Sequence, residues 1–238
     1  MKRIFTLLPI FLLITLFGCK NDIIGQVSGE GPRVSEELDL DSFTGVVNAI
    51  SGDITIVSGN TQKVTIDAQK NIIENLKLNV KEGILYIGYK ENVRRAEKPI
   101  LKIVLPVFDF ASVAGSGNMD INGFGKIDDL HLRVTGSGNI DFDGTADRVR
   151  VNLTGSGRAN LNGEADNGEI RITGSGKFNG EKFPMNNATA NLTGSGNAHI
   201  NCTDQLSGRI TGSGNVIGYG DPKVKMKITG SGKYRDES

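Results

Sequence analysis

The tripeptide Gly-Ser-Gly occurs seven times in the second half of the chain, and this repeat limits the available folds more than any other feature. Successive copies begin 18 to 21 residues apart. A unit of this length can hold two or three short strands with their turns, but it is too short for a propeller blade of roughly 40 residues. The sequence therefore predicts a stack of equal units. The repeated glycines are Gly115, Gly117, Gly136, Gly138, Gly155, Gly157, Gly174, Gly176, Gly194, Gly196, Gly212, Gly214, Gly230 and Gly232.

Residues at fixed distances from the tripeptide keep the same character from copy to copy. The position two before the first glycine is always aliphatic, and its neighbours on both sides are polar in nearly all copies. Because successive side chains of a strand point to opposite faces, this alternation predicts a strand with one buried face leading into each tripeptide. The second residue after the tripeptide is mostly apolar as well, which predicts a similar strand leading out. The aliphatic positions before the tripeptide are Val113, Val134, Leu153, Ile172, Leu192, Ile210 and Ile228.

These columns predict an all-β fold, a right-handed parallel β-helix (solenoid) with Gly-Ser-Gly corners and coils of about 18 to 21 residues. Stacked coils pair each strand with its equivalent in parallel, which explains why equivalent residues are alike. Glycine suits the corners because it tolerates a positive φ and lets neighbouring coils approach without a Cβ between them. Right-handedness is expected because parallel crossover connections are nearly always right-handed. After each corner and its strand, we expect a more variable link to the next copy.

The first half of the chain carries shorter and less regular strand patterns at residues 44–50, 53–57, 63–68, 76–80, 84–89 and 100–105. We expect less regular coils over residues 36–113, regular coils over 114–234, and one β-helix domain over 36–238. A separate small β-domain is the alternative for residues 36–113. The charges of residues 235–237 would discourage pairing at the last strand edge.

The N-terminus has the order of features found in bacterial lipoproteins. Lys2 and Arg3 precede an apolar run over residues 4–17, which is short for a membrane span, and Gly18-Cys19 follows. This end resembles a lipobox, although Phe17 departs from the usual residue type. We expect a lipoprotein signal peptide over residues 1–18, lipidation of Cys19 that anchors the chain to the bacterial outer membrane, and a flexible tether over 19–35. An ordinary cleaved signal peptide is the alternative. The anchored protein could lie on either the periplasmic or the cell-surface face of the outer membrane.

Charge and the few reactive residues argue against several classes of function. The 27 basic and 27 acidic residues balance, so no nucleic-acid partner is expected. His131 and His199 belong to outward columns on different strands, and we interpret them as surface residues rather than as a catalytic or metal pair. Cys202 continues an inward phase and is interpreted as a small buried hydrophobe rather than a nucleophile. No cofactor, no metal and no catalytic residue is predicted.

Two polar groups deserve comparison with known binding chemistry. The first group is an acidic patch made of Asp120, Asp141 and Asp143, with Asn122 and Asn160. Its oxygen atoms would suit calcium, but no known calcium-loop pattern is present. We therefore favour the interpretation that these are solvated surface charges. Nor does any Gly-Ser-Gly open a helix, as a phosphate loop would. The second group is a basic strip on one outer face, interpreted either as a binding strip for an anionic glycan or as an ordinary solubilising face. Its members are Arg133, Arg171, Arg209 and Lys227.

The chain as a whole resembles the family known as putative autotransporter adhesin, head GIN domain. The resemblance is carried by the lipobox-like start, the strand run of residues 43–105, and Thr-Gly-Ser-Gly-Asn at 135–139, 193–197 and 211–215. It implies an exported β-helical protein without an assigned molecular role. Arg158, Lys177 and Lys233 replace the asparagine after the tripeptide, so no unbroken asparagine ladder is expected.

Two functions remain in view. The leading hypothesis is a non-enzymatic cell-envelope lipoprotein whose rigid repetitive surface acts as an adhesin or as a glycan- or protein-binding module. The alternative is a polysaccharide-acting enzyme, a lyase or hydrolase. A glycosidase needs two carboxylates across a cleft, and no long insertion is present to build one. End-to-end or side-by-side homo-oligomers are further expected partners.

Overall fold

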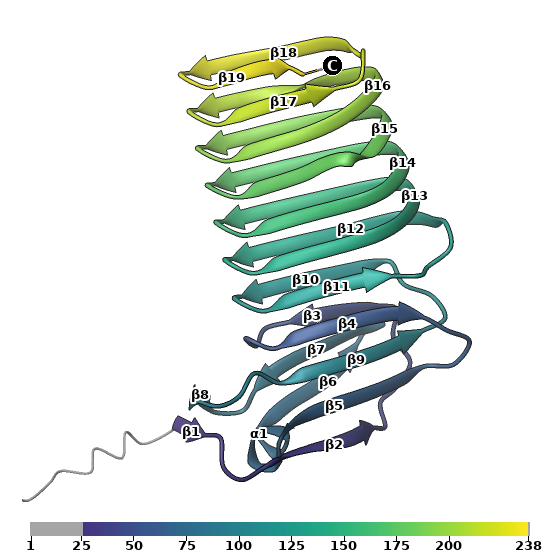
Figure 1. Ribbon diagram of the computed structural model, residues 1–238, viewed down its shortest axis with the longest axis vertical. Coiled ribbons are helices and arrows are strands. Elements are labelled where there is room, and N and C mark those ends of the chain that lie inside the picture. The colour runs from purple at the N-terminus through teal and green to yellow at the C-terminus, as the bar shows by residue number, and fades with distance from the viewer. Residues whose placement is uncertain (1–25, 238) are drawn as a thin grey trace, which may run out of the picture.

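The computed structural model describes residues 26–237, which form one elongated stack of strands with a single short helix at one end (Figure 1). Seventeen of the strands join one sheet that winds around the stack, and the remaining two form a small pair. The predicted parallel solenoid is thereby confirmed, whereas its right-handedness stays a prediction. The signal peptide and Cys19 lie outside the described residues. Within the part of the chain described, no helix is long and apolar enough to cross a bilayer.

The regular part of the stack pairs equivalent residues of successive coils in parallel and in register. The first glycines of the seven tripeptides, for example, all lie in one line from Gly115 to Gly230. The strands of this part are β10 (Phe110–Gly115), β11 (Asn118–Asn122), β12 (Ile127–Gly136), β13 (Asn139–Gly155), β14 (Arg158–Gly174), β15 (Lys177–Gly194), β16 (Asn197–Gly212), β17 (Asn215–Tyr219), β18 (Lys223–Gly230) and β19 (Lys233–Asp236).

Each coil has two sides, joined at one edge by Gly-Ser-Gly and at the other by a broad bend (Figure 1). We call the side whose strands run into Gly-Ser-Gly the entering face, and the side whose strands begin after it the leaving face. The bend differs from the variable link expected from sequence. From β13 to β15 the strands continue through it, and Ala146 pairs with Ala165, which pairs with Met185. Small residues such as Gly144 and Gly163 let the backbone curve there while it keeps its pairing to the next coil.

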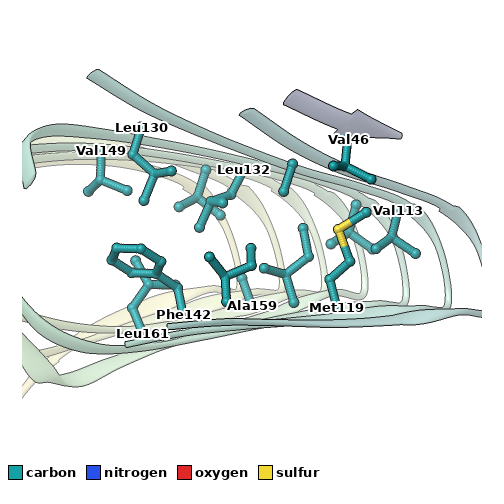
Figure 2. Close-up of a cluster of buried hydrophobic side chains, with 14 of the residues drawn as sticks. Val46, Val113, Met119, Leu130, Leu132, Phe142, Val149, Ala159 and Leu161 are labelled. Atoms are coloured by element: carbon teal, nitrogen blue, oxygen red, sulfur yellow. The ribbon is translucent and has the colours of Figure 1, made fainter. Parts of the chain in front are cut away.

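The core is the space between the two faces, filled by columns of buried apolar side chains (Figure 2). Val113, Leu130 and Val149 project from the entering face toward Met119, Phe142 and Leu161 of the leaving face (Figure 2). Large and small residues alternate along one column, where Phe178 pairs with Ala159 below and Ala198 above, all fully buried. The large ring of Phe178 thus lies between two small side chains, which helps to keep the core close-packed.

The first half of the chain extends the same stack, but not in chain order. Strands β3 (Gly45–Asn48) and β4 (Asp53–Ser58) form a coil that pairs in parallel with β10 and β11 on one side. On its other side the same coil pairs in parallel with β7 (Ile84–Tyr89) and β9 (Ile100–Leu105), which come later in sequence. The coil of residues 45–58 is therefore enclosed between two coils that follow it in the chain.

Antiparallel strands cover the far end of this first part. Strand β6 (Leu76–Lys81) pairs with β7, β5 (Lys63–Gln69) pairs with β9, and β2 (Arg33–Leu38) pairs with β5. Helix α1 (Lys70–Glu74) buries Ile72 and Ile73 against them. Strands β1 (Gln26–Ser28) and β8 (Asn92–Arg95) form the small parallel pair.

Part of the segment for which a flexible tether was expected is consequently folded. Residues 26–28 belong to β1, and β2 already begins at Arg33. The Arg33 guanidinium bonds to Asp67 and to the Lys98 carbonyl, which ties β2 to the rest of the fold. The glycines of this segment predicted a flexible tether. The prediction failed here because the residues that hold β2 in place are distant in sequence and leave no local pattern.

The Gly-Ser-Gly corners depend on glycine at both positions. The first glycine of every copy has a φ between 109° and 127°, which L-residues with a side chain rarely adopt. The serine N–H then donates to the carbonyl of the first glycine in the preceding coil, as from Ser175 to Gly155 at 2.8 Å. A Cβ on Gly174 would lie 2.7 Å from that same Gly155 oxygen, so even a methyl group would disturb the stacking.

The corner between β3 and β4 lacks Gly-Ser-Gly and is built differently. The buried side chain of Asn48 accepts a hydrogen bond from the Ile50 N–H at 3.0 Å and donates one to the Gly52 carbonyl at 3.1 Å. The Asn48 amide thus holds this corner together with backbone bonds to the neighbouring coils, such as that from the Asp53 N–H to the Pro99 carbonyl at 3.0 Å.

Replacing Gly174 by alanine should lower the free energy of unfolding by about 1 to 3 kcal/mol, because it forces an unfavourable φ and a contact with the neighbouring carbonyl. Urea unfolding of the purified variant measures this loss. Gly125→Ala is the matched control, since its Cβ would meet nothing within 4 Å. Equal stability of the two variants would contradict this account of the corners.

Candidate functional site

A hollow of about 570 Å³ on the leaving face is the candidate site. Strands β11, β13, β14, β15 and β16 provide its floor, and most of its lining is amide or charged. Stacking in register places the outward residues of successive coils in rows, so the hollow presents a ladder of similar polar groups. It is lined by Asp120, Asp141, Phe142, Asp143, Asn160, Leu161, Asn162, Lys177, Asn179, Glu181, Lys182 and His199.

One column runs along the whole hollow, and we call it the polar column. It consists of Asp120, Asp141, Asn160, Asn179 and His199, each paired in register with the next. The Asn160 amide donates to Asp141 at 2.7 Å, and the Asn179 amide donates to Asn160. These bonds fix the amide orientations and leave part of each side chain facing the solvent.

A second row supports the polar column. The Asn162 amide donates to Asp143 at 2.8 Å, and Asn122 donates to Asp120 at 3.2 Å. The structure therefore gathers the acidic patch noted in the sequence at this hollow, although Asn122 is not part of the lining. Among the described residues no group of three or more His, Cys, Asp or Glu side chains is arranged to hold a metal ion.

The wall of the hollow comes from an irregularity in β15. The pairing of β15 with β14 is interrupted after Asn160, and its pairing with β16 is interrupted between Gly180 and Met185. Glu181 and Lys182 are exposed at this point, and Phe183 is buried. The ring of Phe183 meets that of Phe142 edge to face at 6.2 Å, which anchors the irregular segment. Such interruptions re-aim side chains beside a regular sheet.

The asparagines that follow the tripeptide form only broken ladders, as expected. Asn139 donates to Asn118 at 2.8 Å, and Asn118 donates to Asp53 at 2.7 Å. Arg158 and Lys177 then interrupt the row, which resumes where Asn215 donates to Asn197 at 3.0 Å. The interruption places Lys177 at the hollow.

The basic strip lies on the entering face, away from the hollow. Arg133, Arg171, Arg209 and Lys227 occupy one column with Asn152 and Asn191 between them, and all four are exposed. Arg171 pairs with Glu169 on its own strand. The four basic residues thus form a continuous row with the two asparagines on the surface, and Glu169 neutralises the charge of Arg171.

The two histidines are not brought together. His131 lies on the entering face, where Asp129 is 3.2 Å from its Nε2 and also pairs with Arg150 at 2.9 Å. His199 lies on the leaving face, stacks on Tyr219 at 6.1 Å between ring centroids, and has its Nδ1 3.0 Å from the Tyr219 hydroxyl.

Cys202 is fully buried, as expected. Its Sγ lies 3.2 Å from the Gln205 carbonyl oxygen, and burial raises the pKa of the thiol. A raised pKa reduces the thiolate fraction, which disfavours nucleophilic chemistry.

Burial lowers the pKa of His199, and the nearby charge of Lys177 lowers it further. The ring should therefore titrate below the ordinary value of about 6.5, and its favourable contribution to stability should be lost as the pH falls through this folded-state pKa. NMR titration of the imidazole measures the value. Lys177→Gln should raise the pKa only part of the way, because burial is the larger cause. An unchanged pKa in that variant would contradict a charge effect from Lys177.

Known proteins resemble the chain in sequence family and in fold. A family model described as "Putative auto-transporter adhesin, head GIN domain" matches residues 42–222. No curated protein matches the chain. Among solved structures, a "putative adhesin" from Bacteroides fragilis is 21% identical, with a TM-score of 0.83 over 88% of this chain and 99% of that one.

Two structures from Parabacteroides are similar in the same way. A "putative lipid binding protein" from Parabacteroides distasonis is 20% identical, with a TM-score of 0.77 over 90% of this chain and 100% of that one. A "putative adhesin" from Parabacteroides merdae is 20% identical, with a TM-score of 0.70 and the same coverage. At these identities the likeness shows the shared fold. The family match spans well over half of the chain, which therefore belongs to the family described as "Putative auto-transporter adhesin, head GIN domain".

Proposed function

We propose that the protein is a non-enzymatic outer-membrane lipoprotein that holds out a rigid repetitive surface for adhesion, and that the hollow on its leaving face binds an extended glycan. The observation that carries this proposal is the polar column, in which five polar side chains follow one another in register along a hollow of about 570 Å³. A repetitive row of this kind suits a repetitive ligand.

The chemistry of the column matches sugar hydroxyl groups. A hydroxyl both donates and accepts, a carboxylate accepts, and an amide does both. Asp141, Asn160 and Asn179 are already held in place by bonds to one another, so binding would require little ordering of these side chains. Equivalent groups recur at the strand spacing of about 4.8 Å, which favours a ligand that lies along the stack.

The placement of the carboxylates supports binding rather than cleavage. A glycosidase holds two carboxyl groups on either side of the scissile bond. Here Asp120 and Asp141 are neighbours in one column of one sheet face, and Asp143 lies in the next outward position on β13. The family and two of the similar structures are named as adhesins and one structure as a lipid binding protein, and none of these names is that of an enzyme.

A glycan panel separates the binder from the enzyme. Purified protein should retain glycans without releasing products, and Asn160→Ala/Asn179→Ala should weaken retention of a neutral glycan about tenfold, the equivalent of about 1.4 kcal/mol in lost hydrogen bonds. Arg171→Ala/Arg209→Ala, on the entering face, is the matched control. Product release would favour the enzyme instead, and loss of an anionic glycan in the control alone would favour the basic strip.

The proposed lipid anchor rests on the order of charge, apolar run and cysteine before residue 20. The described fold begins at β1, beside the end of the stack that α1 covers (Figure 1). A lipid on Cys19 would therefore hold that end close to the bilayer.

Cys19→Ala should abolish incorporation of a fatty-acid label and release the protein from the membrane fraction. Cys202→Ala is the control, because that thiol is buried in the fold and should leave labelling unchanged. Protease treatment of intact cells then decides the face, since loss of the protein indicates the exterior. Membrane retention of the Cys19 variant would contradict lipid anchoring.

A further inference from the structure

The two ends of the stack differ in how the core is covered. At the end near α1, antiparallel β6 and β5 pair with the last parallel strands, and Leu85 and Leu101 beneath them are fully buried. At the other end lie β18 and β19 (Figure 1). Among the pairings of the described residues, β18 pairs with β16 alone and β19 with β17 alone. Each of these two strands thus has one edge without a neighbour.

Inner side chains of β18 remain accessible at this end. Val224 and Ile228 continue the inward columns of Leu206 and Ile210, with which they pair in register. Leu206 and Ile210 are completely buried, whereas Val224 and Ile228 are each 42% exposed. On the other strand, the ring of Tyr234 lies close to Gly218 and packs against the core, as does Met226 between the two exposed residues of β18. The exposed apolar surface of this end is therefore that of Val224 and Ile228.

Three of the four outward side chains of β18 are lysines, and the fourth is Thr229. Lys223, Lys225 and Lys227 alternate with the inner apolar residues, and all three are exposed. None of them takes part in an ion pair among the described residues. On β19, Lys233 and Arg235 add positive charge to the same end, and Asp236 on that strand offsets part of it.

We propose that this edge of β18 binds an extended peptide strand in which acidic and aliphatic side chains alternate. Backbone groups of the free edge would pair with the peptide, as in other cases of strand addition. Aliphatic residues of the peptide would cover Val224 and Ile228, and its carboxylates would lie beside the lysines, where opposite charges on neighbouring strands are favourable.

The same lysines disfavour a second copy docked end to end through this surface. Two such ends would bring Lys225 and Lys227 against a partner's lysines or against Lys233 and Arg235, and like charges on neighbouring strands repel. Lysines on an edge are a known protection against self-pairing. An acidic strand is the partner that this charge pattern admits.

The test uses the full chain carrying Cys19→Ala and a fluorescent peptide of alternating Glu and Val. Anisotropy should show saturable binding that weakens with added salt, and Lys225→Glu/Lys227→Glu should reduce affinity at least about tenfold. Lys77→Glu/Lys81→Glu on β6 is the matched control and should bind normally. The Lys225→Glu/Lys227→Glu variant should in turn bind a peptide of alternating Lys and Val.

A second variant examines the apolar contribution. Val224→Ser/Ile228→Ser should also weaken binding while the protein keeps its circular dichroism spectrum, because both side chains are partly exposed. Failure of the Glu-Val peptide to bind the folded protein would overturn the proposal and leave the lysines with a protective role only. If the protein without lysine substitutions bound the Lys-Val peptide as tightly as the Glu-Val peptide, the proposal would be overturned as well. Self-association in sedimentation that is lost in Lys225→Glu/Lys227→Glu would assign the surface to a second copy of the chain instead. Binding to anionic vesicles that is lost in the same variant would assign it to a membrane.

Discussion

The close approach of neighbouring coils is the constraint on which the rest of the structure depends. Parallel strands pair at about 4.8 Å, and at the Gly-Ser-Gly edge two turns of the chain must come equally near without side chains between them. The contact from the Ser175 N–H to the Gly155 carbonyl is one of a line of such bonds. Glycine is retained there because the carbonyl of one coil occupies the space that a Cβ of the next would need.

Register follows from this constraint, and both the core and the surface follow from register. Once the corners are aligned, every residue lies above its equivalent, so inward columns become apolar and outward columns become rows of like groups. The row from Asp120 to His199 is one result, and the strip from Arg133 to Lys227 is another. The protein thereby acquires extended surfaces from a short repeated sequence. Departures from the repeat, such as the irregular segment of β15, give these surfaces local shape.

Sequence reasoning succeeded where the pattern is local and repeated. Strands β7 and β9 have the limits expected from their alternation, and the inward position of Cys202 followed from its phase. The columns also identified the acidic patch and the interruptions at Arg158 and Lys177. Each of these features depends on positions within one strand or on the constant repeat length.

The remaining features depend on distant partners. No local sequence pattern predicts that β5 pairs antiparallel with β9, or that β6 pairs antiparallel with β7. Nor does any local pattern predict that the coil of residues 45–58 lies between two later coils. The hollow was missed for a similar reason. Its lining residues were visible as polar positions, but its wall arises from an irregularity whose effect depends on the neighbouring strands. The buried role of Asn48 required knowledge of the corner it completes.

The enclosed position of that early coil has a consequence for the order of events in folding. A stack that grew strictly from the N-terminus would add each new coil to the last one made. Here strands β3 and β4 gain their first parallel neighbours, β7 and β9, only when the chain has reached Leu105, and their second, β10 and β11, only when it has reached Asn122. Contacts of such long sequence separation form slowly because a large loop must close first. Each repeat beyond residue 122 can instead pair with the coil that precedes it directly in sequence. The regular coils can therefore form one after another, whereas the part of the stack up to Asn122 must assemble cooperatively.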